Sequence, residues 1–401
     1  MEDSARSSHG TGRLVYLDYQ AAKPVDPRVV EAMLPYFTER FANPASLHTM
    51  GDEAAEALER ARRSIAAFVN ARPEEIIFTS GATESNNLAL IGYALRNRKK
   101  GNHIVISEME HISIHNLAKY LEKNGFEVSR VPLDLFGRVD PGKLRSRIRD
   151  DTILVSIGVA SNEIGTLQPI REIGEILQGK GIAFHTDAVA AEGLLPLDVE
   201  RNHIDLMSLS SNDIYGPRGV GALYVRKGIP LTPLMIGGGQ ENGLRSGTEN
   251  LAGIVGMARA AELMTEEMES EVLRLRALRD RLIEGVLQTV PKSFLNGHPT
   301  ERLASNVHFR FTGIEGESLV LLLRDEGIQA ATGSACSSKT LEPSRTLIAC
   351  GLLHEEAHGS LELTLGRFTT PEDVDAALEA IPRAVQRLRR LSPLYKEEAP
   401  V

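Results

Sequence analysis

The stretch Ser210-Ser211-Asn212-Asp213-Ile214-Tyr215-Gly216-Pro217-Arg218-Gly219 decides how this chain is interpreted, and it joins two β-rich runs, Asp205–Leu209 and Val220–Val225. Similar runs precede it at residues 103–107, 153–156 and 183–187, with helical patterns between most of them. Parallel strands that are buried on both faces are continuously apolar, and these runs have that character. The alternation predicts an α/β fold whose mainly parallel sheet is covered by helices on both faces.

The pattern changes after a long helix that we expect at about residues 251–290. Runs at 304–311, 318–325 and 359–365 alternate between strand and helix, and an amphipathic helix follows at Pro371–Leu391. We therefore expect a flexible tail at residues 1–13, a large α/β domain at 14–260 and a smaller α+β domain at 261–401. The first residues of the large domain are expected to be able to pack on the smaller one.

Composition restricts the class of protein. With 42% hydrophobic and 25% charged residues in 401, the chain has the composition of an ordinary globular protein. A net charge of -9 argues against nucleic acid as the main partner. No apolar run approaches the roughly 18 residues of a membrane span. Two cysteines form no disulfide framework, so we expect a reducing, cytoplasmic location.

Several motifs lie where ligands bind in α/β sheets. Gly81-Ala82-Thr83 follows a strand-like run and opens a helix, so the backbone N–H groups at Ala82 and Thr83 suit a phosphate; an ordinary capped helix is the alternative. Asn162 and Asp187 each follow the end of a predicted strand. Asp187 can hold a protonated ring nitrogen or cap the next helix, and Asn162 can bind a ligand or form a turn.

The second strong signal is Thr332-Gly333-Ser334-Ala335-Cys336-Ser337-Ser338-Lys339. Its small residues suit a loop that carries a thiolate between an active site and an acceptor, and Lys339 can stabilise that thiolate. A cysteine among Gly, Ser and Lys is a poor core residue, so we predict that Cys336 is functional. Cys350 lies in an apolar helical pattern and is predicted to be structural.

Taken in order, these motifs resemble the cysteine desulfurases, fold-type I enzymes of the class V aminotransferase group that use pyridoxal phosphate (PLP). Further matches occur at Tyr16–Tyr19, Asn43–Ser46, Arg245–Thr248 and Gly316–Ser318, so the resemblance covers about residues 16–391. It implies a fold-type I transferase that converts L-cysteine into L-alanine and keeps the sulfur as a persulfide on Cys336.

The resemblance also implies roles for individual residues. His111 stacks on the PLP ring and moves protons, and Asn162 contacts both cofactor and substrate. Ser210 and Asn212 lie at the cofactor, and Arg367 binds the substrate carboxylate through its guanidinium fork. Thr248 reaches the PLP phosphate of a neighbouring subunit, which implies a homodimer.

The chain departs from the family pattern at the cofactor's attachment point. The family has His-Lys where this chain has Asn212-Asp213, and that lysine forms the Schiff base with PLP. A carboxylate cannot form an imine, so Asp213 can serve at most as a general base. Ala190 stands where the family has a glutamine that contacts the cofactor's phenolic oxygen.

Three hypotheses follow. The first is a protein of iron–sulfur cluster assembly whose own desulfuration is weak or lost, with PLP non-covalent or absent. Its Cys336 would carry sulfur from L-cysteine or another donor, or ligate a nascent 2Fe-2S cluster held with a scaffold protein. The second is an active cysteine desulfurase with non-covalent PLP, in which Asp213 or His111 moves protons or Lys23 replaces the missing lysine. The third is a non-catalytic subunit that regulates a competent desulfurase.

Overall fold

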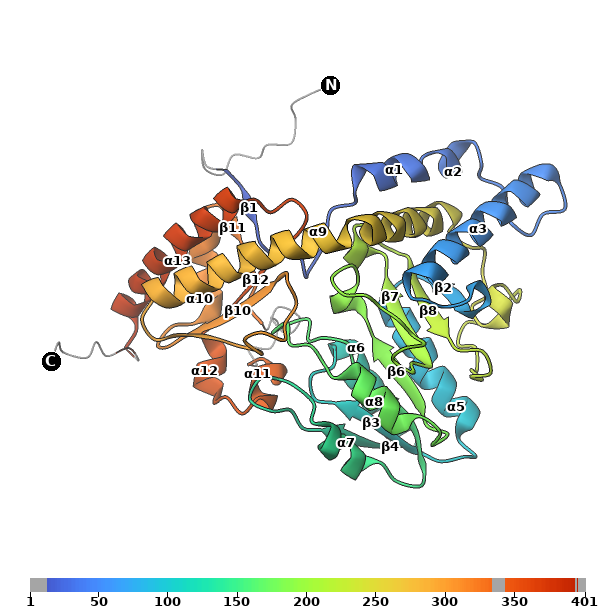
Figure 1. The fold of residues 1–401 in the computed structure, drawn as a ribbon, viewed down its shortest axis with the longest axis horizontal. Helices are drawn as coiled ribbons and strands as arrows, with labels where there is room; N and C mark the ends of the chain where they lie inside the picture. Colours follow the sequence, from blue (N-terminus) through green and yellow to red (C-terminus); the bar gives the residue numbers. More distant parts are fainter. Residues whose placement is uncertain (1–12, 334–342, 394, 396–401) are drawn as a thin grey trace.

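The computed structural model describes residues 13–333, 343–393 and 395. Its centre is a seven-stranded sheet in the order β2-β8-β7-β6-β5-β3-β4 (Figure 1). The strands are β2 (Ile76–Thr79), β3 (His103–Ser107), β4 (Glu127–Val131), β5 (Thr152–Ser156), β6 (Ala183–Asp187), β7 (Leu206–Ser210) and β8 (Gly221–Val225). Strand β8 runs antiparallel to both of its neighbours, β2 and β7, and the other neighbouring pairs in this sheet are parallel. The predicted α/β fold with a mainly parallel sheet is confirmed.

Successive side chains of a strand point to opposite faces of a sheet, and in this sheet the side chains on both faces are buried. On β3, Ile104 and Ile106 enter one apolar core and Val105 enters the other, and all three are fully buried. The first core contains residues of α5 (Tyr93–Asn97) and α6 (Ile112–Lys123), and the second contains residues of α3 (Thr49–Phe68), α8 (Ile170–Leu177) and α9 (Leu251–Thr289).

The second part of the molecule is smaller and contains two sheets. One is antiparallel, in the order β12-β10-β9, and the other pairs β1 with β11 in parallel. Its elements are β9 (Ser293–Leu295), β10 (Asn306–Phe311), α10 (Gly316–Asp325), β11 (Ile328–Gln329), α11 (Arg345–Ala349), α12 (His354–His358), β12 (Ser360–Thr364) and α13 (Pro371–Leu391). Because β1 (Val15–Tyr16) pairs with β11, residues 15 and 16 lie on the smaller part although the following residues build the larger one.

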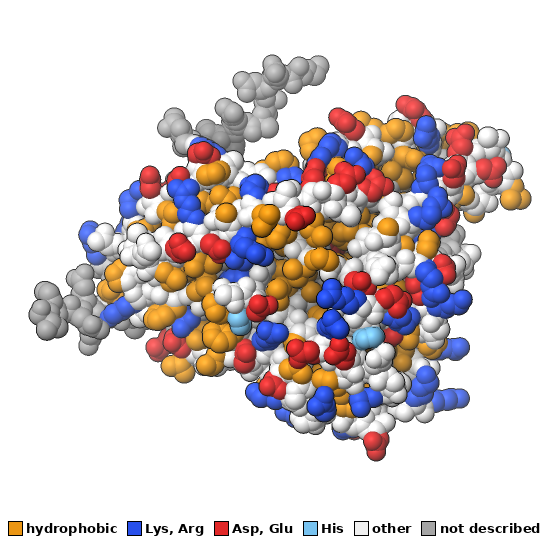
Figure 2. Space-filling view, in the orientation of Figure 1, with side chains coloured by type: hydrophobic (Ala, Val, Ile, Leu, Met, Phe, Trp, Pro, Cys, Tyr) orange, Lys and Arg blue, Asp and Glu red, His pale blue; other side chains and the backbone are white. Residues whose placement is uncertain are grey.

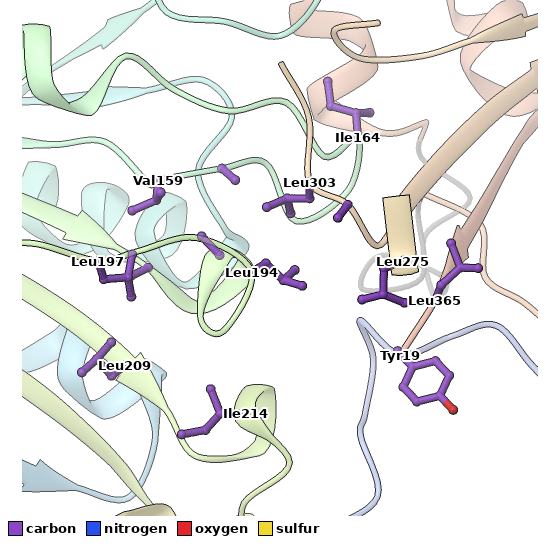
Figure 3. Close-up of a cluster of buried hydrophobic side chains, with 14 of the residues drawn as sticks. Tyr19, Val159, Ile164, Leu194, Leu197, Leu209, Ile214, Leu275, Leu303 and Leu365 are labelled. Atoms are coloured by element: carbon purple, nitrogen blue, oxygen red, sulfur yellow. The ribbon is translucent and has the colours of Figure 1, made fainter. Parts of the chain in front are cut away.

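Helix α9 joins the two parts (Figure 1). It packs on α3 and α1 (Pro27–Met33) at one end and on α13 at the other, so the boundary expected at residues 260–261 falls inside one continuous helix. The apolar core is also continuous there: Figure 3 shows Leu275 and Leu365 beside Tyr19, with Leu194 and Leu209 toward the larger sheet.

The surface is mixed in charge on the face shown in Figure 2, where hydrophobic side chains also gather over α1, α2 (Pro35–Thr38) and the start of α3. Exposed side chains there include Leu34, Phe37, Phe41 and Leu47. No helix within residues 13–333 and 343–393 is long and apolar enough to cross a membrane.

Candidate active site at the carboxyl edge of the sheet

A cavity of about 750 Å³ lies where β3, β5, β6 and β7 end and where the smaller part meets the sheet. Ligands in α/β folds bind at this edge, outside the carboxyl ends of the strands. The sequence-predicted residues that line it are Ala82, Thr83, His111, Asn162, Asp187, Ala190, Asn212 and Asp213. Residues that are as far apart as 131 positions in the sequence are thus brought to one cavity, as the motif order predicted.

Asp187 is held at the end of β6 by neutral donors. The Asn86 amide donates to Asp187 Oδ2 at 2.8 Å, and the Val189 N–H donates to Oδ1 at 3.1 Å. The same Asn86 amide nitrogen lies 3.1 Å from the Ser113 hydroxyl oxygen. His111 caps α6, and its Nδ1 accepts the Ser113 N–H at 3.2 Å, which leaves the proton of a neutral ring on Nε2. Asn86 and Ser113 therefore link the Asp187 carboxylate to the His111 ring.

The start of α4 (Ala82–Asn87) forms another wall. This helix continues through a π-helical turn, Leu88–Gly92, into α5, so the helix expected after Gly81 is present with one irregular turn. Gly81 has φ 151°, and a Cβ on Gly221 would lie 2.6 Å from the Gly81 Cα, so the turn and strand β8 approach closely. The first-turn N–H groups of a helix lack intrahelical acceptors, which suits an anion beside Ala82 and Thr83.

Asp213 lies in a short 3-10 turn, Asn212–Ile214, directly after β7. Lys23 Nζ donates to the Asp213 carbonyl oxygen at 2.5 Å and lies 3.9 Å from Asp213 Oδ1. Burial raises the pKa of Asp213 and lowers the pKa of Lys23, while the attraction between the two charges opposes both shifts. Among the described residues no lysine lines the cavity. Lys23 thus contacts Asp213 without being one of the residues that line the cavity.

Glu110 is a cavity residue that the sequence analysis missed. Its Oε1 accepts the Ser107 hydroxyl at 2.6 Å and the Gly158 N–H at 3.0 Å, while Oε2 has no partner among the described residues. Burial raises the pKa of Glu110 to about 8, and the nearby Asp187 charge adds to the shift. At neutral pH Glu110 is therefore largely an uncharged acid. Its position directly before His111 and after a predicted strand could have indicated that Glu110 lines the site.

A second missed group surrounds Gly333. A Cβ at Gly333 would lie 2.3 Å from Glu163 Oε1 and 2.7 Å from His308 Nε2. Those two atoms are 3.8 Å apart, and neither they nor Glu362 Oε1 has a hydrogen-bond partner among the described residues. Burial raises the pKa of Glu163 to about 7 and the pKa of Glu362 well above its usual value, and it lowers the pKa of His308 to about 3.

The tautomer of His308 follows from its neighbours. Arg310 donates to Asn296 Oδ1 at 2.6 Å, so the Asn296 amide nitrogen is the atom that donates to His308 Nδ1 at 2.8 Å. His308 consequently carries its proton on Nε2, the atom that faces Glu163. No sequence motif predicted this group, since Glu163, His308, Gly333 and Glu362 lie on four separate segments of the chain.

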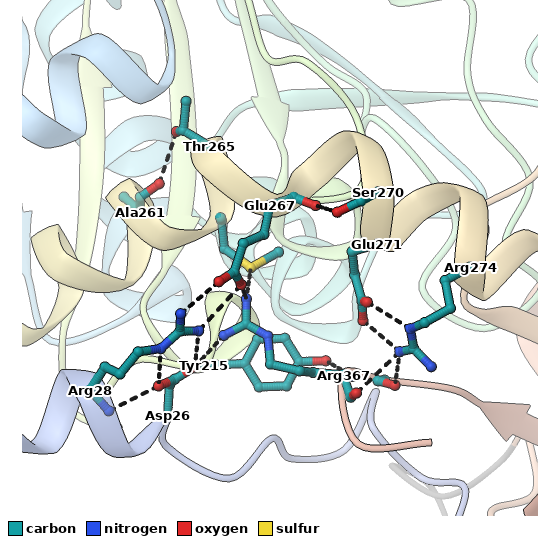
Figure 4. Close-up of polar contacts among 12 residues, drawn as sticks. Asp26, Arg28, Tyr215, Ala261, Thr265, Glu267, Ser270, Glu271, Arg274 and Arg367 are labelled. Carbon is teal, nitrogen blue, oxygen red and sulfur yellow. Dashed lines mark hydrogen bonds and ion pairs between the residues drawn. The ribbon is translucent and has the colours of Figure 1, made fainter. Parts of the chain in front are cut away.

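Arg367, expected to bind the substrate carboxylate, does not line the cavity. Its guanidinium pairs with Asp26 and, at 2.8 Å, with Glu267, and it lies 4.7 Å from the centre of the Tyr215 ring (Figure 4). Hydrogen bonding from Arg28 lowers the pKa of Asp26 to about 2, so this partner stays ionised. In this structure Arg367 is held by carboxylates of the protein itself, and its role at substrate stays a prediction.

Arg345 is the one Lys or Arg among the described cavity residues. It is exposed and makes no ion pair with a described residue. The cavity also contains six carboxyl groups, namely Asp18, Glu110, Glu163, Asp187, Asp213 and Glu362. Most have a raised pKa because of burial, which limits the negative charge that the cavity carries at neutral pH.

The remaining predicted residues lie elsewhere. Ser210 is not a lining residue and its N–H donates to Glu192 Oε1 at 2.7 Å, and Thr248 is exposed. Cys336, the predicted nucleophile and cluster ligand, lies outside the described residues. Cys350 is buried, as expected of a structural cysteine. Within the described ranges no group of three or more His, Cys, Asp or Glu side chains is placed to hold a metal ion.

The residues present fit PLP, the cofactor that the family resemblance implies, except at its attachment point. Asp187 offers an ionisable oxygen for the ring nitrogen, His111 offers a ring face, and the start of α4 offers N–H groups for the phosphate. Asp213 offers no amine. The site thus holds partners for the ring and the phosphate and lacks the covalent anchor at residue 213.

Comparison with known proteins agrees with this geometry. Residues 15–377 match the family model described as aminotransferase class-V. The chain is 58% identical over 381 residues to "Cysteine desulfurase IscS 1" of Archaeoglobus fulgidus, covering 95% of this chain and 99% of the relative. A solved structure titled "NIFS-LIKE PROTEIN" superposes with a TM-score of 0.88 at 36% identity, covering 94% of this chain and all of the other.

A second solved structure, "SspA in complex with cysteine", superposes with a TM-score of 0.80 at 34% identity, covering 89% of this chain and 100% of that one. Family model, relatives and solved structures agree over nearly the whole chain, and eight of the predicted residues, Ala82, Thr83, His111, Asn162, Asp187, Ala190, Asn212 and Asp213, line one cavity. The chain therefore belongs to the cysteine desulfurases of the class V aminotransferase family.

Proposed function

We propose that this protein is an active cysteine desulfurase, which removes sulfur from L-cysteine, releases L-alanine and retains the sulfur as a persulfide on Cys336. The carrying observation is that Asp187, His111 and Asn162 meet at one cavity, in a chain 58% identical to a relative named cysteine desulfurase. The names of the relatives support this alternative better than the first hypothesis, in which desulfuration is weak or lost.

When bound, PLP supplies an electron sink for the charge that develops on the substrate Cα. The chain's own residues provide the rest. Asp187, fixed by Asn86 and Val189, keeps the ring nitrogen protonated without having to reorganise. Asp213, buried at the cavity wall, accepts a proton from substrate in place of the absent lysine. The Cys336 thiolate forms an S–S bond with the substrate sulfur as the C–S bond breaks, and the carbon that keeps the electron pair is protonated, which yields alanine.

The test is anaerobic alanine formation from L-cysteine, with and without added PLP. We expect PLP-dependent alanine from the native protein and a persulfide on Cys336 detected by mass spectrometry. Cys336→Ser should abolish the persulfide, whereas Cys350→Ser, a change at the buried cysteine, should leave the persulfide in place. If only an Asp213→Lys variant forms alanine, the native protein is not an active desulfurase.

One observation supports a second candidate. Asp213 stands where the family has its lysine, so sulfur from another donor could be carried by Cys336 during iron–sulfur cluster assembly, with a scaffold protein and a shared 2Fe-2S cluster. Under this candidate Cys336→Ala stops sulfur or cluster transfer to a purified scaffold protein while native alanine formation is absent. Unchanged transfer by Cys336→Ala excludes it.

A homodimer in the cytoplasm is part of the proposal. Phe37, Phe41 and Leu47 lie close together in the sequence and are exposed. Ile236 is also exposed, 12 residues before Thr248, the residue expected to reach a neighbouring subunit. Exposed apolar patches of this kind commonly form subunit interfaces. Light scattering should give twice the mass of one chain, and a Phe37→Glu/Phe41→Glu variant should shift the protein toward monomer. A native protein that is monomeric at micromolar concentration contradicts this part.

A further inference from the structure

Lys23 and Asp213 lie 190 positions apart in the sequence, yet the lysine's ammonium touches the residue that replaces the family lysine. We propose that Lys23 is a positioning residue for Asp213, whose buried side chain holds the 3-10 turn and keeps the Asp213 carboxyl group facing the cavity. The further consequence, that Asp213 then accepts the substrate proton, rests on the proposed desulfurase function.

The two groups differ in their relation to the cavity. Asp213 lines the cavity and Lys23 does not. Lys23 Nζ donates to the Asp213 carbonyl oxygen at 2.5 Å, and its distance from Oδ1 is 3.9 Å. Its ammonium also lies 5.5 Å from the centre of the Tyr215 ring. One contact holds the backbone of the 3-10 turn, and the charge–charge contact acts on the side chain.

The surroundings make this ammonium important for the charge state of Asp213. The neighbouring ionisable groups are Glu192, after β6, and Asp187, at the end of β6, and both are acidic. Burial and the Asp187 charge raise the pKa of Asp213, whereas the charge of Lys23 and hydrogen bonds from Ser210 and Asn212 lower it. Lys23 is the one cation that acts on Asp213 among these described groups. Without it, the pKa of Asp213 would rise further.

The position of Lys23 also distinguishes positioning from covalent replacement. A lysine that bonds to a ligand must present its nitrogen to the cavity, whereas Lys23 is not a lining residue and its nitrogen donates to the Asp213 carbonyl oxygen. At the position of the family lysine this chain has an aspartate that lines the cavity, with Lys23 in contact with it.

A mutant cycle tests the pair without using activity. Unfolding temperatures of Lys23→Met, Asp213→Asn and the double variant are measured from pH 5 to pH 8.5, with Lys143→Met, a change at an exposed lysine, as control. Removal of one partner of a buried pair leaves an uncompensated charge, whereas removal of both does not. We expect Lys23→Met to be least stable at high pH, Asp213→Asn to restore most of that loss, and the control to behave as native.

The pH profile of alanine formation gives the second readout. The folded-state pKa of Asp213 rises further when Lys23 loses its charge, so ionised Asp213 appears only at higher pH. Loss of a neighbouring opposite charge typically moves a carboxyl pKa by about 1–3 units. The acidic limb should move upward by about that amount in Lys23→Met and return toward native in Lys23→Arg.

Two results overturn the proposal. Stability losses that simply add in the double variant show that the two residues are not coupled. Borohydride reduction with PLP, followed by peptide mass spectrometry that finds the label on Lys23, shows that the lysine bonds to the cofactor instead of positioning Asp213. If the native protein forms no alanine at any pH, the desulfurase proposal fails, while the stability cycle still decides whether Lys23 and Asp213 act as a pair.

Discussion

The cavity has two walls that differ in how their polar atoms are satisfied. On the strand-end wall, Asp187 receives hydrogen bonds from neutral donors on both oxygens, and Asp213 is backed by Lys23. On the far wall, around Gly333, Glu163 Oε1 and His308 Nε2 face each other without a hydrogen bond. A buried polar atom without a partner destabilises a fold by about 1–3 kcal/mol. The first wall thus holds Asp187 and Asp213 through defined partners and leaves Glu110 Oε2 without one, whereas on the second wall Glu163 Oε1 and His308 Nε2 are both unsatisfied.

The strongest test of the strand-end wall is Asp213→Asn. The amide keeps the shape but cannot accept a proton, and loss of a general base typically lowers the rate by about 10²–10⁴-fold. We expect that decrease in kcat for alanine formation, with little change in KM. Asp150→Asn, at an exposed aspartate, is the control. A kcat within threefold of native would mean that Asp213 has no part in proton transfer.

The far wall is tested by Gly333→Ala. The added Cβ would come within 2.3 Å of Glu163 Oε1 and 2.7 Å of His308 Nε2, so these buried side chains must shift. Such overpacking typically lowers the free energy of unfolding by about 1–3 kcal/mol, which urea denaturation can measure. Adding Glu163→Ala removes one of the clashing atoms and should recover part of the loss. Equal stability of native and Gly333→Ala would show that this wall is not closely packed.

Glu110 tests whether the strand-end wall tolerates charge. Its pKa in the folded protein, about 8, lies above the value of roughly 4.3 in an unfolded chain, so the folded state keeps a proton that the unfolded state has lost. The stabilisation is complete at acidic pH and is lost as pH rises toward 8, with a slope of up to about 1.4 kcal/mol per pH unit. Glu110→Gln should remove that slope from unfolding free energies measured between pH 5 and pH 8. A slope identical to native would place the titration on another group.

The smallest expected effect concerns the two arginines. Arg345→Gln removes the one cation on the described cavity lining, and it should raise KM for L-cysteine several-fold without changing the unfolding temperature, since Arg345 is exposed. Arg367→Gln should instead lower stability, because Asp26 and Glu267 lose a charged partner. If Arg367→Gln raises KM and leaves stability unchanged, the family's assignment of the substrate carboxylate to Arg367 holds.

Local patterns were enough to predict most of the fold. Continuous apolar runs predicted β3, β5, β6, β7 and β8 to within one residue at either end, and the amphipathic pattern with its proline predicted α13 at Pro371–Leu391. The rule that ligands bind at the carboxyl ends of strands then placed His111, Asn162 and Asp187 at one edge. The strands are predictable because their burial shows in consecutive apolar residues. The position of the site is predictable because parallel strands end at the same edge of the sheet.

The sequence alone determined the element order, the family and the absence of a lysine at residue 213. Only the tertiary structure decided what surrounds that position: Lys23 behind Asp213, Glu110 as a buried acid, and Arg367 paired with Asp26. The physical reason is that charge state depends on desolvation and on partners distant in sequence, and neither quantity is carried by the local pattern. The sequence showed that residue 213 is not a lysine, and the fold showed that Lys23 contacts the aspartate there.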